Sequence, residues 1–272
     1  MDFKKLFLDQ AKKQKRKIGI VIMRPIPETI ESLKKASEFA DLVVIGPELK
    51  GFENIVEPDQ DKASEILISL LKEKKIDGIV RGQAKDSTTL DVFFRQFAME
   101  PVPSNHKVFS AIMNKDDFNF FVTTCSVYQG LTLEDKIFEV ERIIKHMVQD
   151  FGITPKIAVM GILRPSSKHG KYAMLDEISE QCRQFNEYLL QKGYATKEYY
   201  MEYETAVWEG CNLIVPSTGI VGNSWIKSLL YLGGWTFLSG NYLDLGVVYE
   251  DGTRNEKDFF WHIIHAVALC NK

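Results

Sequence analysis

Short apolar runs alternate with amphipathic segments along most of the chain. The first run, residues 17–23 (KIGIVIM), is continuous and rich in Ile and Val, which is typical of a strand buried on both faces of a parallel sheet. In residues 2–17, apolar side chains instead recur every three or four positions, as on one face of a helix. Such patterns predict strands at residues 17–23, 42–45, 54–56, 76–80, 119–123, 156–160 and 212–215, and helices at residues 2–17, 28–39, 63–74, 87–97, 133–151, 173–192, 224–232 and 259–270. The alternation predicts an α/β fold with mainly parallel sheets.

The length of 272 residues allows one large domain or two of medium size. A Pro-rich stretch at residues 101–104 is the best candidate for a domain boundary. Lys and Arg total 34 and Asp and Glu total 37, so the net charge is −3. A chain with this balance lacks the strongly basic character of proteins that wrap nucleic acid, and we expect no nucleic-acid partner.

We expect no membrane partner and a cytoplasmic location. The longest nearly uncharged stretch, residues 211–225, is interrupted by Pro216, Gly219 and Gly222, and a transmembrane helix needs about 20 mostly apolar residues. No apolar segment of a secretory signal follows the basic N-terminus. The four cysteines are scattered and form no C-x-x-C pair, which favours reduced thiols over a disulfide framework or a zinc site.

Ligands bind beyond the carboxyl ends of strands in open parallel sheets, so the residues just after each predicted strand are informative. Residues 76–88 run from a strand through Arg81 and Gly82 into a helix. A glycine permits close backbone approach, a helix N-terminus attracts anions, and arginine can bind phosphate with two hydrogen bonds. Either an anion site or a tight turn with a surface arginine explains this segment.

Two further loops carry many hydrogen-bond donors. Residues 161–171 contain a cluster of cationic and hydroxyl side chains that suits phosphate or a nucleotide-like group, although an ordinary solvated loop also explains the charges. Residues 215–227 are too uncharged for an ordinary exposed connection, and we expect a site-forming loop or a buried structural turn. The residues concerned are Arg164, Ser166, Ser167, Lys168, His169 and Lys171 in the first loop, and Ser217, Thr218, Gly219, Gly222, Asn223 and Ser224 in the second.

Residues 238–244 look like a turn in which Ser239 and Asp244 flank a glycine. Familiar motifs are missing: there is no G-x-x-x-x-G-K-[ST] phosphate loop, no G-x-G-x-x-G after the first strand, no H-E-x-x-H and no G-x-S-x-G. His262 and His265 lie three residues apart on the last helix, where we expect them at the surface or an interface. We expect no metal and no tightly bound cofactor.

These loops, taken in order, resemble the phosphate acetyltransferase/butyryltransferase family. IDGIVRG stands where the family has A-D-G-x-V-S-G, and FFVTTCSV resembles its D-C-A-V strand end, with Cys125 on the cysteine. GILRPSSKHGK is similar to the S-x-S-T-x-G-S stretch, and VGNSWIK is similar to S-G-N-x-x-Y-K, with Gly222, Asn223 and Lys227 in place. GGWTFLSG resembles the passage that ends in L-S-R-G, with Ser239 on the serine.

The resemblance implies a two-domain, three-layer αβα fold of the isocitrate/isopropylmalate dehydrogenase type, with the active site in an inter-domain cleft. Residues 1–108 and 238–272 would form one domain and residues 109–237 the other. A homodimer is implied as well. The implied reaction moves an acyl group between phosphate and coenzyme A or a related thiol, so the partners would be small phosphorylated or acyl metabolites.

The resemblance also implies roles for individual residues. Asp244 would be the base or its orienting group, and Ser239 would hydrogen-bond the developing oxyanion or the phosphate. Arg81 would bind phosphate, and Cys125 is either a weak nucleophile or a small buried wall residue. The other predicted substrate-binding or phosphate-binding residues are Gly82, Arg164, Ser166, Ser167, Lys168, Ser217, Gly222, Asn223 and Lys227.

Two departures from the family pattern point to a particular branch. The family's S-R-G becomes Ser239-Gly240, which removes an arginine, and its earlier S-G becomes Arg81-Gly82. The short chain and D-G-I-V-R-G look most like the methanogen-marker MtxX proteins, which are named as subunits of a methyltransferase. The alternative function is therefore a non-catalytic or accessory metabolite-binding protein of methanogenic one-carbon metabolism.

Overall fold

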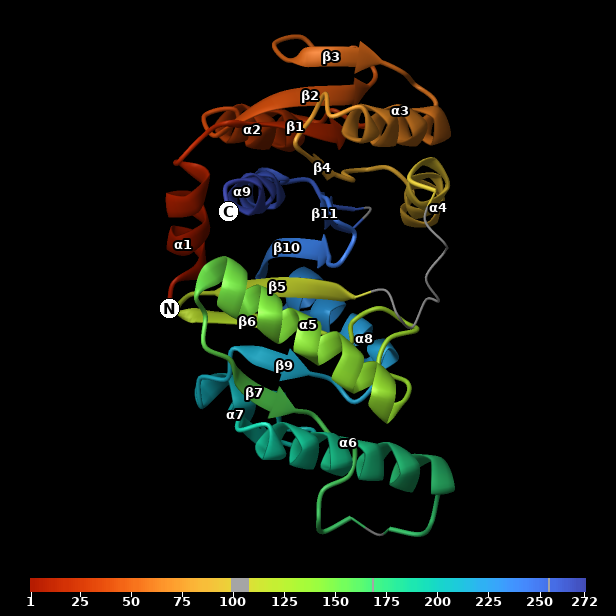
Figure 1. The fold of residues 1–272 in the computed structure, drawn as a ribbon, viewed down its shortest axis with the longest axis vertical. Coiled ribbons are helices and arrows are strands. Elements are labelled where there is room, and N and C mark those ends of the chain that lie inside the picture. Colours follow the sequence, from red (N-terminus) through yellow and green to blue (C-terminus); the bar gives the residue numbers. More distant parts are fainter. Residues whose placement is uncertain (99–107, 168, 254) are drawn as a thin grey trace. The chain divides into compact units, whose positions relative to one another are not determined.

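The computed structural model describes residues 1–98, 108–167, 169–253 and 255–272. Its fold is mixed α/β, and Figure 1 shows helices lying against the strands of a sheet. The chain forms two compact units, which are described separately. The terminal unit comprises Asp2–Pro101 and Leu238–Lys272, and the central unit comprises Met1 and Val102–Phe237. The predicted boundary at residues 101–104 lies outside the described residues.

The terminal unit is built on strands in the order β3-β2-β1-β4-β11-β10. All neighbours in this order are parallel except β10 and β11. The strands are β1 (Arg16–Val21), β2 (Ala40–Gly46), β3 (Glu53–Val56), β4 (Gly78–Val80), β10 (Thr236–Tyr242) and β11 (Val248–Asp251). The helices are α1 (Phe3–Ala11), α2 (Pro27–Ala36), α3 (Gln60–Lys72), α4 (Asp86–Gln96) and α9 (Phe260–Cys270).

The core of the terminal unit lies between the parallel strands and their helices. Ile18 and Ile20 on β1 are fully buried, as their continuous apolar run predicts. Helix α9 contacts α1, α2 and β11, and most of its residues are buried. The expectation that His262 and His265 lie at the surface or an interface is therefore wrong, because they are 1% and 0% exposed and lie inside this unit.

The central unit has the strand order β5-β6-β9-β7-β8, in which only β5 and β6 are antiparallel neighbours. The strands are β5 (Phe109–Lys115), β6 (Phe118–Val122), β7 (Lys156–Val159), β8 (Ala195–Glu198) and β9 (Leu213–Val215). The helices are α5 (Leu133–Phe151), α6 (Ala173–Gln191), α7 (Tyr203–Trp208) and α8 (Gly219–Leu232).

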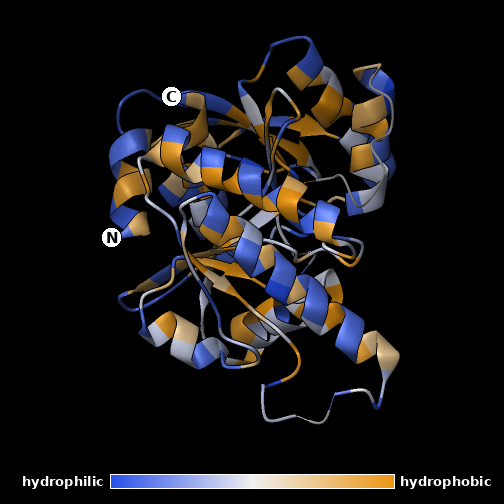
Figure 2. Cartoon of the chain, turned by 60° about the horizontal axis from the view of Figure 1, so that its bottom comes forward, coloured by the Kyte–Doolittle hydropathy of each residue, from blue (hydrophilic) through white to orange (hydrophobic). Residues whose placement is uncertain are grey.

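Helices cover both faces of the sheet in the central unit. Successive side chains of a strand point to opposite faces. On β6, the Phe120 ring stacks on Trp225 of α8 at 5.5 Å, and the Phe121 ring meets His146 of α5 edge-on at 6.1 Å. In Figure 2 the long helices show alternating hydrophilic and hydrophobic residues, as expected for helices that bury one face. None of the described helices is long and apolar enough to span a membrane.

Two predicted loops are largely regular structure. Residues 238–242 belong to strand β10 and not to a turn, and α8 begins at Gly219, five positions before its predicted start at residue 224. Ser239, Gly240 and Asn241 have low strand propensity, but pairing of β10 with β11 overrides it. The glycines at 219 and 222 hid the helix start, because glycine is a poor helix former. Strands β5, β8 and β11 and helix α7 were not predicted either.

Candidate ligand site

In the central unit, the parallel strands β6, β9 and β7 are followed at their carboxyl ends by polar segments. The segment after β6, residues 123–130, is here called the Cys125 loop. The start of α8 follows β9 directly, and Gly219 N donates a hydrogen bond to Gln129 O at 3.0 Å. Because ligands of parallel sheets bind at this edge, we take the Cys125 loop and the start of α8 as the candidate site.

Two glycines let α8 press against the Cys125 loop. A Cβ atom on Gly219 would stand 1.7 Å from Ser126 O, and one on Gly222 would stand 2.1 Å from Thr124 O. Both distances are far below any real contact, so no larger residue fits without moving the backbone. The sequence has glycine at both positions because α8 and the Cys125 loop approach each other closely. Gly222 contributes to the site because it has no side chain.

The Cys125 loop is fixed by hydrogen bonds from within and from α8. The Gln129 side-chain oxygen accepts from Cys125 N at 3.0 Å and from Ser126 N at 2.8 Å. Asn223 Nδ2 donates to Cys125 O at 3.0 Å, which fixes the side-chain amide of a residue predicted to bind substrate. Thr124 has φ of +53°, a left-handed conformation that is uncommon outside glycine and is often found at functional sites.

Beneath the Cys125 loop, α5 carries two buried ionisable side chains. Glu139 Oε1 accepts from Gly130 N at 3.0 Å and Oε2 accepts from Thr124 Oγ1 at 3.2 Å. Lys136 Nζ donates to Gly130 O. Burial raises the pKa of Glu139 to about 8 and lowers the pKa of Lys136, because a charged group loses hydration when it is buried.

The start of α8 favours an anion. Its N-cap Thr218 accepts from Val221 N at 3.4 Å, and the first turn contains no acidic residue. A helix N-terminus carries partial positive charge and free N–H groups, which stabilise nearby anions. Ser217 is 1% exposed, and none of the described residues hydrogen-bonds its hydroxyl group. Lys227 lies exposed further along α8, about two turns after its first residue Gly219.

The loop after β7 is exposed. Arg164 Nε lies 3.2 Å from a Glu202 carboxylate oxygen, and Arg164 N donates to Ser167 Oγ at 3.2 Å. Ser166 is exposed and His169 faces Asp176 at 3.2 Å. Lys168 lies outside the described residues. Arg164, Ser166 and Ser167 therefore share one accessible segment, and their binding roles stay predictions.

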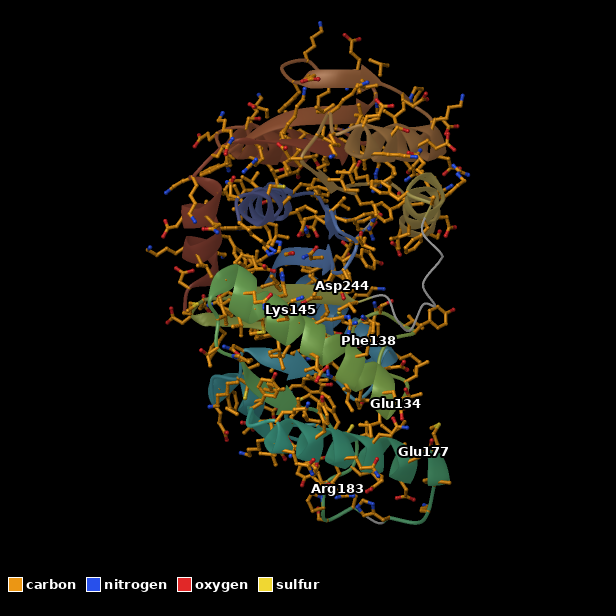
Figure 3. The ribbon with its side chains drawn as sticks, viewed as in Figure 1. Glu134, Phe138, Lys145, Glu177, Arg183 and Asp244 are labelled. Carbon is orange, nitrogen blue, oxygen red and sulfur yellow. The ribbon has the colours of Figure 1, made fainter. Side chains whose placement is uncertain are left out.

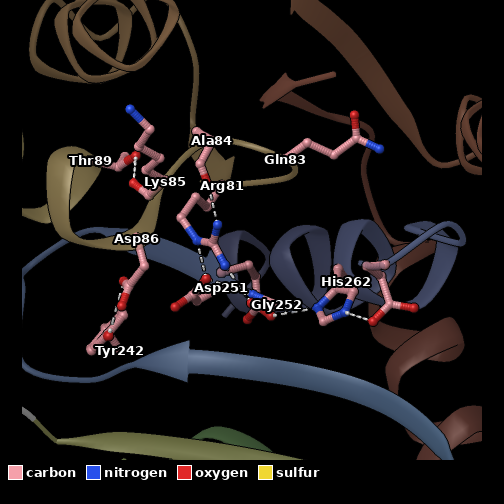
Figure 4. A network of polar contacts seen from close by, with 12 residues as sticks. Arg81, Gln83, Ala84, Lys85, Asp86, Thr89, Tyr242, Asp251, Gly252 and His262 are labelled. Carbon is pink, nitrogen blue, oxygen red and sulfur yellow. Dashed lines mark hydrogen bonds and ion pairs between the residues drawn. The ribbon is translucent and has the colours of Figure 1, made fainter. Parts of the chain in front are cut away.

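The predicted phosphate ligand Arg81 is buried in the terminal unit. Its side chain is 2% exposed. Nε donates to Asp251, NH1 to the carbonyl of Ala84 and NH2 to the carbonyl of Gly252, as Figure 4 shows. We call this set of contacts the Arg81 network. Each guanidinium nitrogen of Arg81 donates a hydrogen bond to a protein oxygen. The network therefore favours a structural role for Arg81 over an anion-binding role.

Gly82 has φ of +62°, and a Cβ atom there would stand 2.1 Å from Val21 O. Glycine is therefore required for the packing of this turn, which is the tight-turn alternative left open by the sequence. A binding role for Gly82 stays a prediction.

Ser239 faces inward beside the Arg81 network. It is 0% exposed, and its Oγ donates to Glu250 Oε2 at 2.8 Å and lies 2.9 Å from His265 Nδ1. His265 Nδ1 also lies 2.6 Å from Glu250 Oε1. Burial raises the pKa of Glu250 to about 7. These groups contact one another inside the unit, which favours a structural role for Ser239.

Asp244 lies apart from this buried cluster. It is exposed in the turn between β10 and β11 and has φ of +62°. Ser239 and Asp244 therefore differ in exposure: the serine side chain is buried and the aspartate side chain is accessible to solvent. The roles predicted for both residues stay predictions. An accessible carboxylate at Asp244 is compatible with the role of a general base.

Cys125 contributes its backbone to the candidate site. The thiol is 2% exposed, and its Sγ lies 3.6 Å from Val122 O. Burial raises the pKa of this thiol far above its ordinary value, so little thiolate forms at neutral pH. The geometry favours the wall residue over the nucleophile. Among the residues that the structure describes, no group of His, Cys, Asp or Glu is arranged to hold a metal ion.

Four residues of the candidate site were missed by sequence reasoning: Thr124, Gln129, Lys136 and Glu139. A signal existed for the last two. The buried face of α5 continues through Val140, Ile143 and Met147, and Lys136 and Glu139 occupy apolar positions in the same helical register. Figure 3 marks Glu134, Phe138 and Lys145 on the same helix. A charged residue in an otherwise apolar stripe predicts a buried polar contact.

The structure resembles a phosphotransacetylase from Streptococcus pyogenes, with a TM-score of 0.67 and 15% identity over 99% of both chains. It also resembles a branched-chain phosphotransacylase from Enterococcus faecalis, with a TM-score of 0.64 and 17% identity over 93% of this chain and 99% of that one. At such identity the likeness establishes the fold. No protein-family profile matches the chain.

The chain is also similar in sequence to a curated protein. Over 270 residues, the chain is 27% identical to a curated protein of Methanosarcina mazei named "Putative methyltransferase mtx subunit X", covering 96% of this chain and 93% of that protein. The predicted resemblance to MtxX is confirmed. The likeness to MtxX covers 96% of the chain and therefore extends through both compact units.

Proposed function

We propose that this protein is a phosphate acyltransferase-like enzyme that moves an acyl group between phosphate and a coenzyme A-type thiol. The fold is that of phosphotransacetylases over nearly the whole chain. The observation that carries the proposal is the start of α8, where Gly219 and Gly222 bring a helix N-terminus without acidic residues against the Cys125 loop. This arrangement suits an anionic substrate such as an acyl phosphate or the phosphates of coenzyme A.

The reaction balances without a redox partner. The thiol loses its proton to a base, the sulfur attacks the carbonyl carbon, a C–S bond forms, and the C–O bond to phosphate breaks. Phosphate leaves with the bonding electron pair. Asp244 is the proposed base, because it is an accessible carboxylate. Asn223, Ser217 and Lys227 are the proposed ligands of phosphate and coenzyme A, and Arg164, Ser166 and Ser167 offer further donors on an accessible loop.

The test is an exchange assay with purified protein, coenzyme A, and acetyl or butyryl phosphate. We expect a thioester to form. Asp244→Asn should lower kcat about 100-fold, which is the lower end of the effect of losing a general base. The matched control is Asp41→Asn, an exposed aspartate on β2, and it should leave kcat unchanged. Absence of thioester with every short acyl chain would contradict the proposed reaction.

A second candidate is a metabolite-binding protein that does not turn over its ligand. The Arg81 network favours it, because the arginine and serine that would serve the chemistry are both enclosed by protein contacts. Calorimetry with coenzyme A, acetyl phosphate and inorganic phosphate separates the two candidates. Binding with thioester formation supports the enzyme, whereas binding of coenzyme A or acetyl phosphate without product supports the accessory protein.

A further inference from the structure

The Cys125 loop rests on two buried ionisable side chains that the proposed chemistry does not use. Glu139 is 0% exposed and Lys136 is 1% exposed, although charged residues are almost never fully buried without partners. Both come from α5, and both contact Gly130. Their burial needs an explanation, because removing either charge from water is costly.

The two side chains bind both backbone polar groups of Gly130, its N–H and its carbonyl oxygen. Gly130 N donates to Glu139 Oε1 at 3.0 Å, and Gly130 O accepts from Lys136 Nζ. Gly130 has φ of +59°, and a Cβ atom there would stand 2.2 Å from Thr124 Cγ2. The end of the Cys125 loop therefore lies against its beginning, in a position that only glycine permits.

Glu139 also holds the beginning of the loop. Its Oε2 accepts from Thr124 Oγ1 at 3.2 Å, and Thr124 has the left-handed φ of +53°. A β-branched residue in this conformation persists only where its surroundings enforce it. The carboxylate of Glu139 is thus a bridge between Thr124 and Gly130.

The next residue along the chain contacts the candidate site. Thr124 sets the direction of the following peptide, and Cys125 O accepts from Asn223 Nδ2 at 3.0 Å. We propose that Glu139 and Lys136 are positioning residues that act through the Cys125 loop to orient the side-chain amide of Asn223. This inference rests on the proposed function, in which Asn223 binds the substrate.

One experiment measures the orientation of Asn223 directly. In protein labelled with ¹⁵N-asparagine, hydrogen exchange of the Asn223 side-chain amide should become about tenfold faster in Glu139→Ala, because a local contact that slows exchange is lost. Glu139→Gln can still accept from Gly130 N and contact Thr124 Oγ1, so it should restore exchange to within about twofold of the unmodified protein. Glu141→Ala, two residues away on α5, is the matched control and should change nothing.

A double-mutant cycle tests whether the effect travels through Asn223. When Asn223 is present, we expect Glu139→Ala to raise the Kd for coenzyme A about tenfold. When Asn223→Ala is already present, we expect Glu139→Ala to raise this Kd less than about twofold. A structural role alone would weaken binding equally in both backgrounds, and that result would overturn the proposal. If Glu139→Ala fails to fold, Lys136→Met gives the same comparison.

The failure of this proposal and of the proposed function can be told apart. If the unmodified protein binds no coenzyme A, the proposed function fails, and exchange at Asn223 alone decides the inference. Unchanged exchange in Glu139→Ala and in Lys136→Met would overturn it, whatever the protein binds.

Discussion

The two compact units each contain a polar cluster, and the clusters differ in what their polar groups contact. In the terminal unit, Arg81, Asp251, Ser239 and Glu250 form hydrogen bonds with protein groups and are buried. In the central unit, buried groups support a loop and a helix start that reach the surface. Asn223 is half-buried there, next to exposed residues of the same helix.

The difference teaches that a residue selected by its resemblance to a motif can contact protein groups instead of lying open to a ligand. Ser239 stands on the serine of the family's L-S-R-G passage, but its hydroxyl contacts a glutamate and a histidine within its own unit. Arg81 stands where the family has a serine, and its guanidinium is enclosed by protein oxygens. The central unit, in contrast, keeps an N-terminus of α8 suited to an anion.

The largest expected effect is loss of the buried ion pair in the terminal unit. Arg81→Ala leaves the Asp251 carboxylate buried without its partner and should lower the free energy of unfolding by about 3–5 kcal/mol. Arg183→Ala removes an exposed arginine that pairs with Glu180 and Glu187, and it should leave the free energy of unfolding nearly unchanged because solvent screens exposed ion pairs. Figure 3 labels Arg183 on α6. Chemical denaturation measures both. An Arg81→Ala variant of undiminished stability that no longer binds phosphate would restore the anion-binding role.

The next effect depends on pH. The pKa of Glu250 is raised to about 7 in the folded protein, so its stabilising contribution is complete below about pH 4 and is lost as the pH rises through 7. This shift corresponds to about 3 kcal/mol between acidic and neutral pH. Glu250→Gln should therefore make the free energy of unfolding fall less steeply between about pH 4.5 and 7, the window between the ordinary and the raised pKa of this carboxyl group.

The control for this measurement is Glu134→Gln, an exposed glutamate on α5, whose slope should match that of the unmodified protein. An unchanged slope in Glu250→Gln would show that Glu250 does not titrate in this range, and the account of the buried cluster would then be wrong.

A smaller effect on stability should accompany a clear effect on binding at the start of α8. Gly222→Ala places a Cβ atom 2.1 Å from Thr124 O and should cost about 1–3 kcal/mol of unfolding free energy, as overpacking does elsewhere. Because the contact between α8 and the Cys125 loop opens, affinity for coenzyme A should fall as well. Ser224→Ala, an exposed position on the same helix, is the control. Calorimetry that finds equal affinity for both variants would remove the start of α8 from the site.

The smallest expected effect concerns the exposed loop after β7. Arg164→Ala removes a cation and its ion pair with Glu202, and should lower stability by less than about 1 kcal/mol. If Arg164 binds phosphate groups, affinity for coenzyme A should fall a few-fold. Glu202→Ala breaks the same ion pair and keeps the cation. Equal affinity in the two variants would mean that Arg164 takes no part in binding.

Local patterns were sufficient for most of the fold. The helix at residues 133–151 was predicted with the bounds that α5 has, because Thr132 forms a capping box with Asp135 and Gly152 ends the helix with φ of +64°. The buried parallel strands were also found, since continuous Ile and Val runs mark them. Strands β10 and β11 were missed, because their pairing joins segments whose residues alone favour turns.

The candidate site was predicted only in part, for a related reason. Composition pointed to residues 215–227, and the structure has α8 starting there against the Cys125 loop. Whether a polar side chain faces a ligand or another side chain depends on contacts between distant segments. Arg81 meets Asp251, 170 positions away, and no local pattern around residues 76–88 contains that partner.

The central claim is that ligand binds beside the Cys125 loop and the start of α8, whereas the Arg81 network supports the fold. Amide hydrogen exchange with and without coenzyme A tests it most directly. We predict slower exchange on ligand binding in residues 123–130 and 217–223, and unchanged exchange in residues 79–84 and 248–252. Slower exchange confined to residues 79–84 and 248–252 would contradict the account.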